Sequence, residues 1–136
     1  MKAGDAFLIP NEHGIRHLYV VISDPDQNPA SVYLVMVSTH ETGKDETCIL
    51  NQGDHPRINH RSVVVYQMPP AVLTSVSRLQ TLAENKTIIP QPPVSESVLL
   101  KIREGCKTSR YIESRIESLL YNQGLLKYGL SSTKMP

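Results

Sequence analysis

Ser31-Val32-Tyr33-Leu34-Val35-Met36-Val37-Ser38 contains the longest apolar run of this 136-residue chain, from Val32 to Val37. Valine and tyrosine favour strands over helices. The run is far too short to cross a bilayer. We therefore expect the strongest strand of the fold here. It delivers three polar side chains to its C-terminal end, those of Ser38, Thr39 and His40.

Four other segments also have the composition of strands: residues 6–9, 17–23, 47–50 and 62–66. The segment 17–23 is a near-continuous apolar run, which is typical of a strand buried on both faces. Residues 72–82 are expected to form a short closing strand or a helical turn. Five or six short strands, spaced about a dozen residues apart with no helix between them, predict a small antiparallel barrel or sandwich.

The apolar pattern changes to a helical period after a cluster of three prolines, at positions 90, 92 and 93. One helix is expected to begin at Ser95 and to stop near Gly105. A second is expected to start near residue 108 and to end around residue 123. We interpret the proline cluster as a stiff link that is too short to separate two independent domains.

The chain has about the length of one domain and can bury a core without disulfides. The sequence predicts an α+β protein: a small antiparallel β-barrel over residues 1–90, followed by C-terminal helices over residues 91–136 that pack on the same domain. Cys48 and Cys106 lie 58 positions apart, which argues against a disulfide framework or a Cys-rich zinc site. The N-terminal residues lack the pattern of a signal peptide, so we expect a cytoplasmic protein with no membrane partner.

One loop concentrates polar chemistry: Gly53-Asp54-His55-Pro56-Arg57-Ile58-Asn59-His60-Arg61-Ser62, directly before the strand at 62–66. Two histidines, two arginines and an aspartate between turn-forming residues are typical of a functional loop on a rigid scaffold. The simpler interpretation is an ordinary polar loop in which Asp54 only shapes a turn. The net charge of +1 gives no global attraction to nucleic acid, so the local distribution of charge decides.

Further polar residues stand at strand ends, where loops of a small barrel can converge on one rim. Histidine exchanges protons near neutral pH, and arginine holds phosphate with two parallel hydrogen bonds. Together they suit phosphodiester cleavage, in which one group deprotonates an attacking hydroxyl and a cation stabilises the charged intermediate. The candidate residues are Arg16 and His17, Ser38, Thr39 and His40, and Asp54, His55, His60 and Arg61.

A metal site is the alternative explanation for the histidines. His40, Asp54, His55 and His60 would complete a set of three histidines and one aspartate, which could hold zinc. The pair His55 and His60 spans Pro56 on a loop, however, and does not have the spacing of zinc-binding pairs on a helix. Walker A, G-x-G-x-x-G and G-x-S-x-G patterns are absent, which argues against nucleotide binding and serine hydrolysis.

Three segments, in this order and spacing, resemble the MazF/PemK (Kid-like) toxin family. They are Gly4-Asp5-Ala6-Phe7-Leu8-Ile9, Gly14-Ile15-Arg16-His17-Leu18-Tyr19-Val20-Val21-Ile22-Ser23 and Val35-Met36-Val37-Ser38-Thr39. The resemblance covers roughly residues 4–82. His17 stands where the family has a proline, and the family's aspartate segment is replaced by the histidine-rich loop. The loop and its following strand also resemble a less characterised branch of toxin-like proteins, for which no activity is implied.

The resemblance implies an SH3-like barrel, often dimeric, that cleaves single-stranded RNA without a metal or other cofactor. It matches Arg16 to the arginine that stabilises the scissile phosphate, and Ser38 or Thr39 to the hydroxyl position. It further implies a homodimer with a cognate antitoxin as partner. We assign catalysis to Arg16, Thr39, His55 and His60, and RNA contacts to His17, Ser38, His40, Asp54 and Arg61. The alternative is a non-catalytic module of the same fold that binds protein or nucleic acid.

Overall fold

The computed structural model describes residues 1–127, so the last part of the expected helical extension, residues 128–136, lies outside the described residues. Strands and helices together confirm the expected α+β class. The strands are β1 (Ala6–Pro10), β2 (Arg16–Val21), β3 (Val32–Thr39), β4 (Ile49–Leu50), β5 (Ser62–Val65), β6 (Val72–Thr74) and β7 (Ile89–Gln91). The helices are α1 (Val76–Glu84), α2 (Glu96–Cys106) and α3 (Ser114–Asn122).

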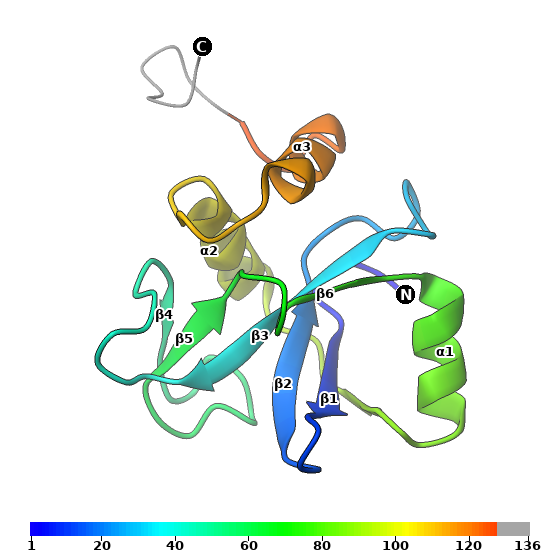
Figure 1. Ribbon diagram of the computed structural model, residues 1–136, viewed down its shortest axis with the longest axis horizontal. Coiled ribbons are helices and arrows are strands. Elements are labelled where there is room, and N and C mark those ends of the chain that lie inside the picture. Colours follow the sequence, from blue (N-terminus) through cyan, green and yellow to red (C-terminus); the bar gives the residue numbers. More distant parts are fainter. Residues whose placement is uncertain (128–136) are drawn as a thin grey trace.

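The seven strands form one antiparallel sheet around β3, the strand expected to be the strongest (Figure 1). The order is β4-β5-β3-β2-β1-β7. β6 pairs with the first half of β3 and β5 with its second half, so the two strands are neighbours of different parts of β3. No pairing joins β4 to β7 within residues 1–127, so the described sheet is open and not clearly the closed barrel that the sequence predicted.

The central strands are buried on both faces, as expected for the second strand. Leu18 and Val20 of β2 belong to a core cluster that includes side chains of α2 and α3, whereas Tyr19 and Val21 belong to a second cluster with Leu79 of α1. Figure 1 shows α1 on one side of the sheet and α2 with α3 on the other. A strand with helices against both faces needs apolar residues at every position, which explains the unbroken run.

The helix boundaries follow from local capping and packing. Ser95 caps α2 as expected, because its Oγ accepts a hydrogen bond from the Val98 N–H at 3.2 Å. Gly105 does not stop this helix but lies in its last turn. A Cβ at Gly105 would collide with the ring of Tyr66, whose hydroxyl donates to the Ile102 carbonyl at 2.7 Å. The glycine therefore lets β5 and α2 approach closely.

The segment expected to be a short closing strand or a helical turn, residues 72–82, contains both β6 and most of α1, and no helix lies among the strands from β1 to β6, as expected. Two other expectations about the elements were wrong. The stiff link begins as a strand, β7, which tolerates Pro90 because it lies at the sheet edge. Helix α3 begins at Ser114, later than expected, because Ser109 instead bonds Asp45 at 2.7 Å and the Tyr111 N–H at 3.2 Å. With 11 residues, α2 is the longest described helix, and none within residues 1–127 could cross a membrane.

Candidate functional site

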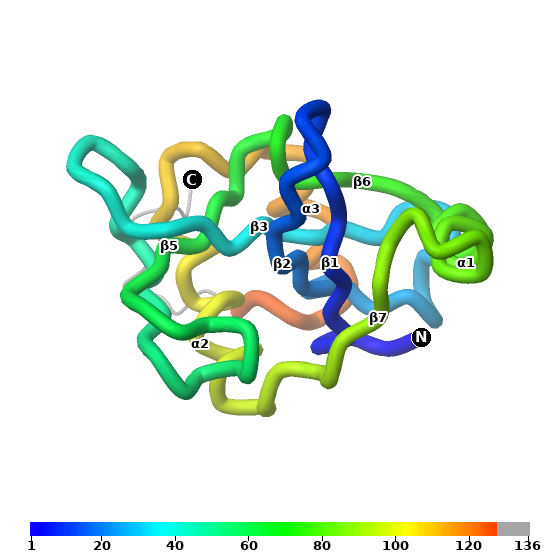
Figure 2. Tube along the Cα trace, turned by 90° about the horizontal axis from the view of Figure 1, so that it is seen from below, coloured from blue at the N-terminus to red at the C-terminus, as the bar shows by residue number. Residues whose placement is uncertain are grey.

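A pocket of about 520 Å³ opens between the ends of β2 and β3 and the loop that precedes β5. We call it the arginine pocket, after Arg16 and Arg57 in its lining. Figure 2 shows this loop at the end of the molecule away from α1. Of the nine predicted site residues, five line the pocket: Arg16, His17, Ser38, Thr39 and His60. The other four, His40, Asp54, His55 and Arg61, do not.

The register of the sheet brings Arg16 and Thr39 together. Leu18 of β2 pairs with Val37 of β3 in antiparallel register. Arg16 lies two residues before Leu18 and Thr39 two residues after Val37, so both lie on the same face at the same end of the sheet. The pairing of Thr39 with Ser62 then places the end of the loop beside them. The three segments that carry the site are thus joined by strand pairing.

His60 is coupled to two neighbouring side chains. Its Nε2 lies 2.9 Å from the Thr39 Oγ1, and its Nδ1 lies 2.7 Å from the Asn59 Oδ1. An amide oxygen only accepts, so the Nδ1 carries the proton and donates it to Asn59. The Nε2 lone pair then accepts the hydrogen bond of the Thr39 hydroxyl. These hydrogen bonds orient His60 with its Nε2 lone pair toward a hydroxyl group, as a general base requires.

The lining of the arginine pocket is cationic. Arg16 and Arg57 both line it, and none of its lining residues is an aspartate or glutamate. The Arg57 Nε donates to the Gln91 Oε1 of β7 at 2.8 Å, which fixes the guanidinium beside the pocket. Arginine without a carboxylate partner favours an anionic ligand, above all one with phosphate oxygens that accept two parallel hydrogen bonds.

His55 has a different environment, in the interior. It is 2% exposed, its Nε2 donates to the Pro92 carbonyl at 2.7 Å, and its Nδ1 accepts from the Arg57 N–H at 3.0 Å. Both ring nitrogens are thereby occupied by backbone groups. The structure places this residue away from the pocket lining, as a tie between the loop and the segment after β7. Asp54 likewise shapes the turn, since its Oδ2 accepts from the Asn51 N–H at 2.8 Å.

The remaining predicted residues surround the site without joining one cluster. The His40 Nε2 lies 2.6 Å from the Glu46 Oε2, within the loop after β3. Ser38 lines the pocket but receives a hydrogen bond from the Lys44 Nζ at 2.9 Å, and the same ammonium donates to the Thr39 carbonyl at 2.7 Å. The Arg61 side chain is exposed and makes no hydrogen bond or ion pair within residues 1–127.

The four residues of the alternative metal site do not converge. His40 pairs with Glu46, Asp54 with the Asn51 backbone, and His55 with the Pro92 carbonyl. His60 is held by Asn59 and Thr39. Across the described part of the chain, no group of three or more histidine, cysteine, aspartate or glutamate side chains could hold a metal ion.

Sequence reasoning missed three residues of this region. Arg57 was not among the candidate residues, whereas Arg61 was, yet Arg57 lines the pocket and Arg61 does not. Asn59 was not considered, although an amide next to a candidate base is the kind of group that orients an imidazole. Lys44, in the charged loop after β3, could not be placed because nothing in its local sequence indicates that it folds back onto Ser38 and Thr39.

Comparisons with models of protein families, with curated proteins and with solved structures found no match to this chain. The site must therefore be interpreted from its own geometry.

Proposed function

We propose that this protein is a metal-independent endoribonuclease of the MazF/PemK type that cleaves single-stranded RNA in the arginine pocket. The observation that carries the proposal is the combination in one pocket of two arginines, no carboxylate, and a histidine whose Nε2 lies 2.9 Å from the Thr39 hydroxyl. The arginines fit the scissile phosphate, and the histidine fits the proton transfer that RNA cleavage needs.

The reaction follows from the orientation of His60. The 2′-hydroxyl of the RNA takes the place of the Thr39 hydroxyl at Nε2, gives up its proton there and attacks the adjacent phosphorus. The bond from phosphorus to the 5′ oxygen breaks, that oxygen takes a proton from solvent water, and the protonated His60 afterwards returns its own proton to solvent. The products are a 2′,3′-cyclic phosphate and a 5′-hydroxyl. Arg16 and Arg57 stabilise the negative charge that develops on the phosphoryl oxygens, and the freed Thr39 hydroxyl donates to one of them.

The resemblance to the toxin family supports the same assignment independently. It matches Arg16 to the phosphate-binding arginine and Ser38 or Thr39 to the hydroxyl. Thr39 is the better of the two, because the ammonium of Lys44 already bonds the Ser38 Oγ at 2.9 Å. With the family come three further proposals: an SH3-like arrangement of the strands around β3, a homodimer, and a cognate antitoxin as partner. Pull-down from the native host would reveal the antitoxin.

The test is cleavage of an unstructured RNA by the purified protein in EDTA, which removes contaminating metal-dependent nucleases. Arg16→Ala should lower the rate by about 100-fold, the usual weight of one group that stabilises transition-state charge. Arg78→Ala is the matched control, because it removes an exposed arginine of α1 that does not line the pocket. Its rate should stay within about threefold of wild type. Intact RNA with folded wild-type protein would overturn the proposal.

A non-catalytic binding module is the second candidate. The Thr39–His60 pair is exposed, and open sites exclude water poorly, which is unfavourable for catalysis but harmless for binding. The same pocket would then grip an RNA phosphate without turnover. Salt-sensitive RNA binding that depends on Arg16, together with no cleavage and no effect of His60→Ala, would establish this alternative.

A further inference from the structure

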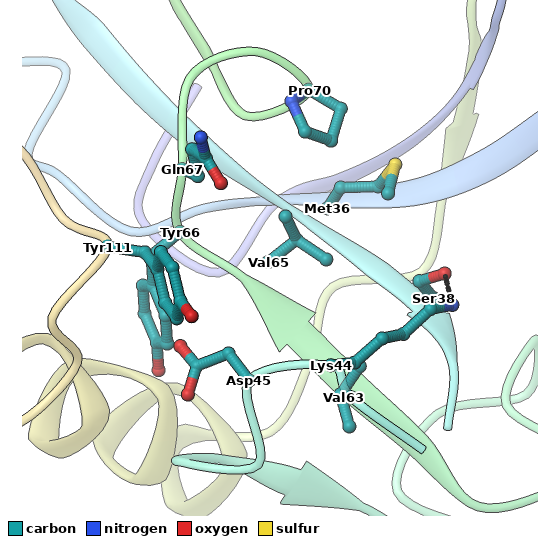
Figure 3. A pocket seen from close by; sticks show the side chains of 11 residues that line it. Met36, Ser38, Lys44, Asp45, Val63, Val65, Tyr66, Gln67, Pro70 and Tyr111 are labelled. Atoms are coloured by element: carbon teal, nitrogen blue, oxygen red, sulfur yellow. Dashed lines mark hydrogen bonds between the residues drawn. The ribbon is translucent and has the colours of Figure 1, made fainter. Parts of the chain in front are cut away.

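A second pocket, of about 450 Å³, flanks the same end of β3 as the arginine pocket. Figure 3 shows its lining, which comes from β3, β5, the loops that follow them, and the segment between α2 and α3. We call it the tyrosine pocket, after Tyr111. Its volume is in the range of pockets that hold small ligands. Tyr111 lies outside residues 4–82, the part of the chain that carries the family resemblance.

The two pockets meet at Ser38, which lines both of them. Lys44 marks the boundary, since its ammonium donates to the Ser38 Oγ and to the Thr39 carbonyl while its side chain also lines the tyrosine pocket. Side chains alternate between the two faces of a strand, so Met36 and Ser38 face the tyrosine pocket whereas Val37 and Thr39 face the arginine pocket. An RNA strand that occupies both pockets therefore passes around the end of β3, and the group that it places in the tyrosine pocket is a nucleoside.

The walls of the tyrosine pocket suit a flat ring. Met36, Val65 and Pro70 supply apolar surface, and the Tyr111 ring is 45% exposed. Single-stranded nucleic acids are held by stacking of their bases on such exposed aromatic side chains. The Tyr111 loop is fixed in place, because the Ser109 hydroxyl donates to Asp45 at 2.7 Å and accepts from the Tyr111 N–H at 3.2 Å.

The polar groups of the pocket suit the edge of a base. The Gln67 amide and the Tyr111 hydroxyl make no hydrogen bond to any residue from 1 to 127, so both remain available to a ligand. An amide side chain offers a donor and an acceptor side by side, the pattern that pairs with adenine. Asp45 is not available in the same way, because Thr47 and Ser109 already occupy its carboxylate oxygens.

We propose that the tyrosine pocket binds a nucleobase of the RNA that is cut in the arginine pocket, by stacking on Tyr111 and pairing with Gln67, with adenine preferred. The proposal rests on the nuclease function for the identity of the strand. It assigns to the segment between α2 and α3 a role in choosing where the RNA is cut.

The test measures binding by fluorescence anisotropy, in EDTA, with the His60→Ala variant as background so that the RNA stays intact. The probes are short, labelled single-stranded RNAs, oligo-A and oligo-C. Oligo-A should bind more tightly than oligo-C. Tyr111→Ala should weaken oligo-A binding by roughly tenfold, the weight of one stacked base. Tyr111→Phe, which keeps the ring, should stay within about threefold. Gln67→Ala should abolish the preference for oligo-A.

Tyr121→Ala is the matched control, because Tyr121 is also an exposed tyrosine but lies in α3 and does not line the pocket. It should leave binding unchanged. If Tyr111→Ala and the His60→Ala background bound oligo-A equally tightly, the proposal that the tyrosine pocket binds a base would be overturned. The nuclease proposal is tested separately, by cleavage with wild-type protein. If wild-type protein cut no RNA but bound oligo-A in a way that depends on Tyr111, the nuclease proposal would be overturned and the proposal of base binding in the tyrosine pocket would stand.

Discussion

His55 and His60 stand five residues apart in the same loop, yet they have opposite environments. His55 is buried, and both of its ring nitrogens bond backbone groups of other residues. His60 is exposed at the arginine pocket, and its ring nitrogens bond two side chains, those of Asn59 and Thr39. Hydrogen bonds to the backbone hold His55 in place in the fold. The Nε2 lone pair of His60 instead faces a hydroxyl group, from which it can take up a proton.

The loop therefore has two parts with different roles. The first part, through Arg57, ties the loop to the segment around β7 by way of His55 and the bond from Arg57 to Gln91. The second part, Asn59 and His60, presents a base to the pocket. The first part therefore sets the position of the second, and variants of each should change different measurable quantities.

The largest expected effect separates the histidines by activity. His60→Ala should lower the rate of RNA cleavage by about 100-fold or more, because it removes the general base. Its free energy of unfolding should change by less than about 0.5 kcal/mol, since the side chain is exposed. Cleavage assays and urea unfolding measure the two quantities. Undiminished cleavage would exclude His60 as the base.

The second effect is the reverse of the first. His55→Ala should lower the free energy of unfolding by about 2–4 kcal/mol, because it opens a cavity and leaves the Pro92 carbonyl and the Arg57 N–H without partners. Urea unfolding measures the loss. If His55→Ala instead left stability unchanged and abolished cleavage in folded protein, His55 would belong to the chemistry, and the division of the loop would fail.

A smaller effect is expected at Asn59, which positions the imidazole of His60. Asn59→Ala should reduce kcat for RNA cleavage by about tenfold and leave KM nearly unchanged, because it removes the acceptor of the Nδ1 proton. Asn59→Asp keeps an oxygen at that place and should restore most of the rate. Equal rates for Asn59→Ala and wild type would show that Asn59 does not orient the ring.

The smallest expected effect is on the stability of the protein at acid pH, and it serves as a reference for the stabilities of the histidine variants. Burial acts to raise the pKa of Asp45, but hydrogen bonds from Thr47 and Ser109 outweigh it and hold the pKa below its usual value. A pKa that is lower in the folded state adds stability above the unfolded value, about 3.9, and this stability is lost as the pH falls through the folded value. Ser109→Ala should reduce the free energy of unfolding that is lost between pH 5 and pH 2, because it removes one of the hydrogen bonds that lower the pKa of Asp45. Urea unfolding at a series of pH values measures this quantity. An unchanged pH profile would contradict the assignment.

Much of the sheet could be predicted because its signal is local. The valine-rich runs in β2, β3 and β5, with a tyrosine in each of β2 and β3, indicate strands wherever they occur. β7 could not be predicted, because its middle residue is Pro90 and only its place at the sheet edge beside β1 makes the proline acceptable. The start of α3 was misplaced because the partner of Ser109 is Asp45, far away in the sequence.

The candidate site was predictable in part for the same reason. Arg16, Thr39 and His60 stand at strand ends, and strand pairing brings such ends together. The different roles of His55 and His60 were not predictable from the loop, since the partner of His55 is the carbonyl of Pro92, 37 residues away. The pocket contacts of Lys44 and Tyr111 likewise depend on tertiary packing. Sequence patterns located the loop, and only long-range contacts assigned its residues.

The central claim is that His60 activates the 2′-hydroxyl of an RNA whose phosphate lies in the arginine pocket. The most direct measurement uses an RNA oligonucleotide that wild-type protein cuts at one site in EDTA, and the same oligonucleotide with a single 2′-deoxy nucleotide on the 5′ side of that site. We expect a 2′,3′-cyclic phosphate from the first and no cleavage of the second. Cleavage of the 2′-deoxy oligonucleotide at the same site would contradict the account.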